Sequence, residues 1–351
     1  MNTNLLKELV EGHGVPGQED LIREIVAREL KGICELSTDS MGNLIALKRG
    51  NGGKNGKGKK LMLAAHMDEI GFVVKFIDKD GFIRINPLGG FDPRQMNSQR
   101  VIVHTDKGPI NGVLMYGTKP KHLLTDAEAS AGQNIDSFFV DCGLGDKTKD
   151  SVNIGDMVSM SRQMIRLGDL FSCKAMDDRA CVFIMIEAVK KAKNHAVDVY
   201  AVATVQEEIG LRGASAAGSA IAPDVVVALD VTLANDIPGV QEQDHVTKLG
   251  GGAAIKIMDS SLICHPKVVA HFKKLAIKHK IPYQMEILPR GGTDAGGIQR
   301  LHGGIPAFTL STPTRYIHTV NESVHKDDVQ ACIDLLAKYI EDAHNGNYSY
   351  D

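Results

Sequence analysis

The sequence contains no tryptophan, and phenylalanine and tyrosine together make up only 5% of its residues. Sites for bases or long sugar chains commonly stack their ligands on aromatic rings, so such platforms are poorly supplied here. The formal net charge of −3 offers no basic surface for a nucleic acid. One glycine- and lysine-rich segment, residues 51–60, lacks aromatic neighbours, and we interpret it as a mobile hairpin tip. The composition therefore predicts no nucleic-acid partner.

Closely spaced cysteine pairs and long apolar runs are also missing. The six cysteines are Cys34, Cys142, Cys173, Cys181, Cys264 and Cys332. No C-x-x-C pair occurs among them, which indicates reduced, mostly buried thiols rather than a disulfide framework. No apolar run approaches the roughly 20 residues of a membrane span, and the beginning "MNTNLLKELVEGHG" lacks the apolar core of a signal peptide. We expect a cytoplasmic protein without a membrane partner.

Two kinds of pattern alternate along the 351 residues. Residues 1–69 and 166–351 show apolar strands alternating with amphipathic helices, which predicts an α/β domain. Residues 70–165 instead show short β-like segments separated by turns, such as "GFVVKFID" and "RVIVHTD". We therefore expect a β-rich, barrel-like domain at 70–165 that is inserted into the α/β domain.

Ionisable side chains collect at the ends of the apolar strands. His66 and Asp68 follow "LMLAA", and Glu207 and Glu208 follow "VYAVATVQ". Further examples at strand or helix ends are Asp177, Asp178, Asp230 and His318. Ligands of open α/β sheets bind outside the carboxyl ends of the strands, so these groups are expected to meet at one edge. Two imidazoles and several carboxylates suit a pair of divalent cations, without which so much buried negative charge would be costly.

The motifs that carry these residues resemble those of a known family. "AAHMDEIG", "CKAMDDRA", "VQEEIGLRGA", "ALDVT", "RGGTDAGGIQ" and "RYIHT" follow the order and approximate spacing of the glutamyl aminopeptidase/TET family of dinuclear metallo-aminopeptidases. The resemblance covers essentially the whole chain, including the inserted segment. It implies a zinc-exopeptidase-like α/β fold, with a mixed central sheet, helices on both faces and an inserted β-rich barrel-like domain.

The resemblance also implies a set of metal ligands. His66 and Asp230 resemble the ligands of one metal ion, and Glu208 and His318 resemble those of the other. Asp177 resembles the carboxylate that bridges both ions. We expect two divalent ions per subunit, with zinc as the first choice and cobalt or manganese as the others, because all three accept such ligands.

Two further carboxylates resemble the family's catalytic residues. Glu207 resembles the general base, and Asp68 resembles the carboxylate that orients the imidazole of His66. Neighbouring side chains of a strand point to opposite sides, so we expect Glu208 to face a metal ion and Glu207 to face the water. The family also implies a cis peptide bond between Asp177 and Asp178.

The same resemblance implies a substrate and an assembly. The substrates are short peptides that lose their N-terminal residue, and Thr293 and Asp294 would line the substrate pocket, although a tight structural turn is an equal alternative. The β-rich insert would mediate dimerisation, and six dimers would form a dodecamer. Two other functions stay open: a metal-dependent deacylase of N-acyl amino acids, and an endoglucanase, since some family members carry that label. A non-enzymatic assembly protein is disfavoured by the intact set of ligands and base.

Overall fold

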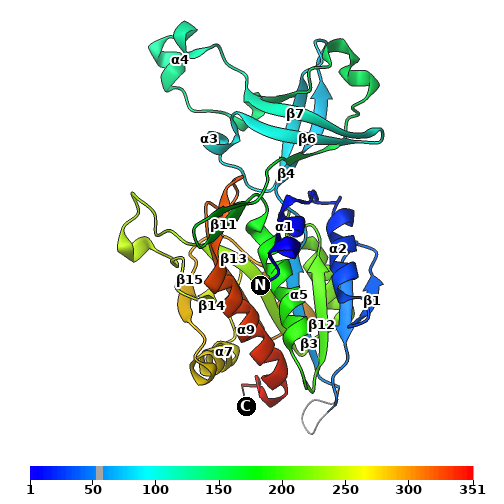
Figure 1. Ribbon diagram of the computed structural model, residues 1–351, viewed down its shortest axis with the longest axis vertical. Coiled ribbons are helices and arrows are strands. Elements are labelled where there is room, and N and C mark those ends of the chain that lie inside the picture. The colour runs from blue at the N-terminus through cyan, green and yellow to red at the C-terminus, as the bar shows by residue number, and fades with distance from the viewer. Residues whose placement is uncertain (53–57, 351) are drawn as a thin grey trace.

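The computed structural model describes residues 1–52 and 58–350 (Figure 1). Residues 53–57 of the segment that we interpret as a hairpin tip lie outside the described residues. The described chain forms a mixed α/β part and a closed β-barrel, which lies beyond one end of the large sheet (Figure 1). The predicted fold class is confirmed.

The α/β part is built on an eleven-stranded sheet. Its main path runs β1 (Glu35–Thr38), β2 (Leu44–Lys48), β12 (Asp198–Thr204), β3 (Lys60–His66), β13 (Val225–Leu233), β16 (Ala307–Arg315), β17 (Glu322–His325), β11 (Leu170–Cys173) and β10 (Ile165–Leu167). A side branch adds β14 (Ala253–Met258), which pairs with β16, and β15 (Tyr283–Ile287), which pairs with β14.

The four central strands β12, β3, β13 and β16 are parallel. Five of the seven residues in β3 are apolar and fully covered, as expected for a strand with helices over both faces. Parallel pairing sets Thr204 beside His66 and Asp230 beside Ser311. The strands that carry the candidate ligands therefore end at the same edge of the sheet.

Helices cover both faces of this sheet. The first face carries α1 (Thr3–Glu11), α2 (Asp20–Leu30), α5 (Met176–Lys191), α7 (Pro266–His279) and α9 (Lys326–Asp342). The second face carries α6 (Arg212–Ile221) and α8 (Asp294–Ile298). Within the described residues, no helix is long and apolar enough to cross a membrane.

The barrel has its own hydrophobic core. It closes in the order β4 (Gly71–Ile77), β5 (Ile83–Leu88), β8 (Phe138–Asp141), β7 (Gly108–Tyr116), β6 (Gln99–Thr105) and β9 (Met157–Met160). Two short helices, α3 (Pro93–Met96) and α4 (Asp126–Ser130), lie in its connections. One residue from the α/β part, Val320, packs into the barrel core, so the two parts share a hydrophobic contact.

A buried ionic cluster fixes the chain just after β3. The Glu69 carboxylate lies 2.8 Å from the ammonium nitrogen of Lys174 and 3.4 Å from the Arg179 guanidinium. Arg179 also donates hydrogen bonds to the carbonyls of Met67, Leu9, Gly12 and Gly14. Because these carbonyls belong to α1, to the loop after it and to the segment after β3, one side chain connects the segment after His66 to the N-terminal part of the chain.

Replacing Arg179 by methionine should therefore destabilise the fold strongly. The variant leaves Glu69 with one cation fewer and removes the Arg179 donor from four carbonyls. Of these, Gly12 keeps the Lys174 ammonium and Gly14 keeps the Glu69 N–H. Breaking a buried pair costs about 3–5 kcal/mol. Urea denaturation followed by circular dichroism measures the change in the free energy of unfolding. The control is Arg94→Met, because Arg94 pairs with Asp92 at an exposed site and should shift unfolding by less than about 1 kcal/mol. Equal losses in the two variants would contradict this account.

Candidate metal centre

The candidate ligands come from five segments at the carboxyl edge of the sheet. His66 is the last residue of β3, and Asp230 lies near the end of β13. Asp177 lies in the irregular start of α5, where the Asp177–Asp178 peptide bond is cis, as the sequence predicted. Glu208 follows β12, and His318 follows β16 with a left-handed backbone at φ 62°.

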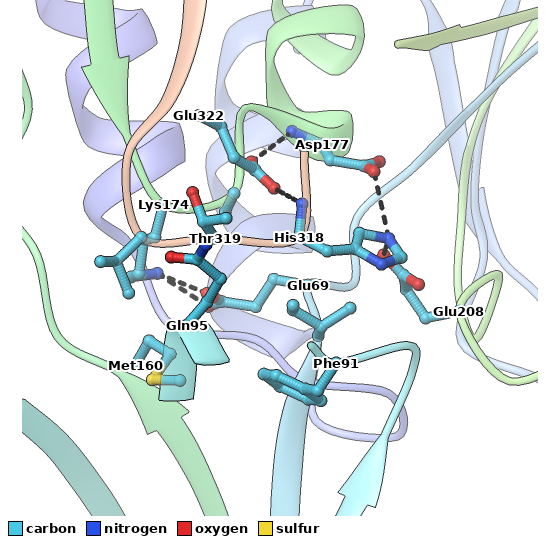
Figure 2. Close-up of a pocket in the computed structure, with 13 residues that line it drawn as sticks. Glu69, Phe91, Gln95, Met160, Lys174, Asp177, Glu208, His318, Thr319 and Glu322 are labelled. Carbon is cyan, nitrogen blue, oxygen red and sulfur yellow. Dashed lines mark hydrogen bonds and ion pairs between the residues drawn. The ribbon is translucent and has the colours of Figure 1, made fainter. Parts of the chain in front are cut away.

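Asp177 lies between the two imidazoles (Figure 2 shows its contact with His318). Its Oδ1 is 3.1 Å from His66 Nε2, and its Oδ2 is 3.4 Å from His318 Nε2. His318 Nε2 also lies 3.3 Å from Glu208 Oε1. Ligand atoms of His66, Asp177 and Glu208 fall within 4.8 Å of one another, as do those of His66, Asp178 and Asp230. The structure thus brings all five predicted ligands together.

The donor set fits divalent cations. Burial raises the pKa values of Glu207, Asp178 and Asp230 well above their ordinary range, and neighbouring carboxylates raise them further. Asp178 Oδ1 is buried and has no hydrogen-bond partner among the described residues. Carboxylates and imidazoles are the ligands that zinc and similar ions take, and such ions would offset the mutual repulsion of these groups.

Asp68 contacts both the imidazole and the glutamate pair. Its carboxylate is fully buried and accepts the backbone N–H groups of Glu207 and Glu208 at 3.0 and 3.1 Å. His66 Nδ1 lies 3.0 Å from the Asp68 carbonyl oxygen and 3.6 Å from carboxylate Oδ1. The backbone of Asp68 is therefore nearer to the imidazole than its carboxylate, whose hydrogen bonds go to the turn that follows β12.

The glutamate pair lies in a turn and not in a strand. β12 ends at Thr204, and the chain then passes through Gln206 with φ at 57°. Strand alternation therefore does not explain how the two side chains diverge. The turn itself separates them: Glu208 reaches His318, whereas Oε2 of Glu207 lies 3.9 Å from His66 Nε2.

Glu322 is a functional candidate that the sequence reasoning missed. Its buried carboxylate accepts the backbone N–H of Asp177 at 2.9 Å and that of His318 at 2.7 Å (Figure 2). One side chain thus fixes the backbone of two candidate ligands from different segments. The only sequence signal was its position four residues after His318. Asp178, which the sequence placed at the same edge without a ligand role, groups with His66 and Asp230.

The structure buries Thr293 and Asp294, the predicted lining of the substrate pocket. Thr293 Oγ1 lies 2.9 Å from the hydroxyl of Thr309 and donates to Asp259 at 3.3 Å. Asp294 accepts a hydrogen bond from Thr204 at 2.6 Å, and burial raises its pKa to about 6. Both side chains are about 98% or more covered, so their contact with substrate stays a prediction.

A narrow pocket opens beside His318 and Glu208. The barrel supplies one wall through Phe91, Gln95 and Met160 (Figure 2). The barrel chain reaches the centre closely, because a side chain at Gly90 would lie 3.3 Å from the His318 ring. The pocket is therefore shared between the sheet edge and the barrel.

The chain matches the model of a known protein family. The family model described as M42 glutamyl aminopeptidase matches residues 42–335, which is most of the chain. The chain belongs to this family. Membership in the M42 family places the protein among the aminopeptidases, which are hydrolases, and confirms the resemblance seen in the sequence motifs.

Individual relatives cover nearly the full chain. The lysyl aminopeptidase of Pyrococcus furiosus is 38% identical over 349 residues, which is 96% of each chain. The solved structure of aminopeptidase APDkam598 from Desulfurococcus kamchatkensis is 39% identical and has a TM-score of 0.91 over 97% of this chain and 94% of its own. The TET1 peptidase of Pyrococcus horikoshii, described as assembling into a tetrahedron or a large octahedral shell, is 28% identical with a TM-score of 0.85 over 96% and 98%.

Replacing Glu322 by glutamine tests whether this residue positions the M42 site. An amide offers one acceptor oxygen where the carboxylate serves two backbone N–H groups, so Asp177 and His318 should lose part of their fixed geometry. We expect metal affinity or activity to fall about 10- to 100-fold, as for other residues that orient ligands. Competition with a chromogenic chelator measures the affinity. An unchanged affinity together with unchanged turnover would contradict the positioning role.

Proposed function

We propose that this protein is a metal-dependent aminopeptidase that removes N-terminal residues from short peptides. The observation that carries the proposal is the position of Asp177, whose two oxygens face the imidazoles of two different segments. One carboxylate shared by two such ligand groups favours a pair of cations over a single one. Family membership supports the same activity.

The residues divide between two metal positions. His66 and Asp230 would hold one ion, Glu208 and His318 would hold the other, and Asp177 would contact both. Asp178 lies near enough to the His66–Asp230 position to balance its charge. Zinc is the proposed ion, and cobalt and manganese suit the same nitrogen and oxygen ligands.

The chain's own groups supply the remaining requirements of hydrolysis. Two bound divalent ions would lower the pKa of the attacking water and polarise the scissile carbonyl. Glu207 would accept the proton of that water. Its carboxylate lies beside His66 and would ligate neither proposed ion, which supports this role. Burial raises the pKa of Glu207, which suits a group that later returns the proton to the leaving amine. Asp68 holds the turn that carries this base through two hydrogen bonds.

The pocket suits the end of a peptide better than its middle. Barrel residues wall it on one side, and Asp177, Glu208 and Glu322 are among its lining residues. A protonated α-amine is the part of a peptide that such a negative lining would favour. This arrangement supports an exopeptidase that acts from the N-terminus.

We further propose that the protein is a homo-oligomer of the kind described for the Pyrococcus horikoshii relative. In this proposal, residues 70–165 form the dimerisation domain, and dimers assemble into a dodecamer. Large apolar side chains exposed on this segment, namely Phe76, Phe82, Val113 and Ile154, support an interface there. A closed shell would admit only short peptides.

Replacing Glu207 by glutamine should separate metal binding from turnover. Both ions should remain bound, because this side chain ligates neither, while the loss of the base should lower kcat about 10²- to 10⁴-fold. Metal content by atomic absorption and kcat on an aminoacyl p-nitroanilide provide the two measurements. Glu208→Gln is the matched control and should lose metal as well as activity. Full turnover in Glu207→Gln would refute the base assignment.

A panel of chromogenic substrates should define the reaction class. Free aminoacyl p-nitroanilides should be cleaved in the presence of zinc or cobalt, and EDTA should abolish cleavage. N-acetylated versions should resist cleavage, because they lack the free amine. Preferential hydrolysis of N-acyl amino acids would instead indicate a deacylase, and hydrolysis of cellulose that survives EDTA would indicate a glycoside hydrolase.

A further inference from the structure

A network of buried polar side chains lies on the sheet face beneath α8. Side-chain alternation places Asp230, Thr232, Thr309 and Ser311 on this face, while Thr312 faces α5 and α9 through Cys181 and Cys332. Sheet interiors are normally filled by apolar groups, and buried polar groups require partners. A set of polar side chains on one buried face therefore calls for an explanation.

Lys256 lies at the centre of this network. Its side chain is fully buried on β14, and its Nζ lies 2.8 Å from Glu286 Oε1 on β15 and 3.6 Å from Asp259 Oδ2. Burial alone would lower the pKa of Lys256, but the carboxylates of Glu286, Asp259 and Asp230 outweigh burial and raise it. The ammonium group is thus charged in a place where charge is costly.

Two branches lead from Lys256 to the candidate metal centre. In the first, Glu286 Oε1 accepts a hydrogen bond from Thr232 at 2.7 Å, and Thr232 is two residues beyond Asp230. In the second, Asp259 accepts from Thr293, the residue that precedes α8.

The second branch continues through α8 to the glutamate turn. Asp294, the first residue of α8, accepts from Thr204 at 2.6 Å. Thr204 is the last residue of β12, three positions before Glu207. The two branches therefore end on the strands that carry Asp230 and the Glu207–Glu208 turn.

We propose that Lys256 is a positioning residue for the reaction, because its buried ammonium group holds together the two branches that set Asp230 against the Glu207 turn. The inference rests on the proposed function and extends it to a residue that belongs to a neighbouring strand and contacts no proposed ion. Without the ammonium group, Glu286 and Asp259 lose the cation they share. The ends of β13 and β12 are then no longer fixed relative to each other.

The test compares two variants of Lys256 with the wild type, each loaded with cobalt(II). Lys256→Met keeps an unbranched apolar side chain at this position and removes the positive charge. The double variant Lys256→Met/Glu286→Gln also removes the carboxylate charge that the first leaves unpaired, while the amide oxygen can still accept from Thr232. The double variant keeps the test decisive if Lys256→Met alone does not fold.

A third variant controls for lost stability. Leu275 is buried in α7 on the opposite sheet face, so Leu275→Ala destabilises the fold through a cavity and leaves the network intact. We expect it to melt at a lower temperature with the cobalt absorption spectrum and kcat of the wild type.

Both Lys256 variants should change the cobalt absorption bands, which report ligand geometry, and lower kcat about 10- to 100-fold with a much smaller change in KM. The double variant should regain much of the melting temperature that Lys256→Met loses, but not kcat. If the double variant recovered kcat and the spectrum along with the melting temperature, the inference would be overturned, because Lys256 would then stabilise the fold without positioning the ligands.

Measurements on the wild-type protein test the proposed function independently of the Lys256 variants. A wild type that binds cobalt but cleaves no aminoacyl substrate would overturn the aminopeptidase proposal, and the spectra of the variants would still decide whether Lys256 positions the metal ligands. A wild type that binds no cobalt would overturn both.

Discussion

Negative charge buried at one edge of one sheet is the constraint on which the rest of this structure depends. Four carboxylates converge there, because the parallel strands end where helix α5 begins. They belong to Asp177, Asp178, Glu208 and Asp230. Burial raises the pKa values of three of them, Asp178, Glu208 and Asp230, which shows that ionisation is disfavoured unless positive charge is near. Divalent ions held by these carboxylates and by the neutral imidazoles of His66 and His318 would provide that charge.

The surrounding side chains keep these carboxylates in place. Asp68 and Glu322 each accept two backbone N–H groups from segments that carry ligands or the base. Farther out, Arg179 and Lys256 are buried cations that connect separate segments through carboxylates or carbonyls. Buried polar contacts therefore surround the candidate ligands. Asp68 and Glu322 contact the segments that carry the ligands, and the buried cations contact segments farther out.

The sequence predicted the parts of this arrangement that depend on local patterns. Continuous apolar runs predicted the central strands, and the positions of His66 and Asp230 at the ends of such runs predicted them as candidate ligands. Long-range pairing was not readable in the same way. Lys256 and Glu286 lie in segments whose charges suggest exposure, and only the pairing of β14 with β15 shows that they neutralise each other. The turn at Gln206 was missed because nothing local signals that β12 stops at Thr204.

The loop after β16 belongs to both parts of the molecule. His318 reaches the candidate metal centre, and two residues later Val320 packs into the core of the barrel. Any ion held by His318 therefore restrains a segment that the barrel core also needs. By thermodynamic linkage, occupancy of the centre adds to the stability of barrel docking, and loosening of the barrel weakens the centre by the same free energy. We therefore expect the barrel and the candidate metal centre to respond together to metal binding, although their hydrophobic cores are separate.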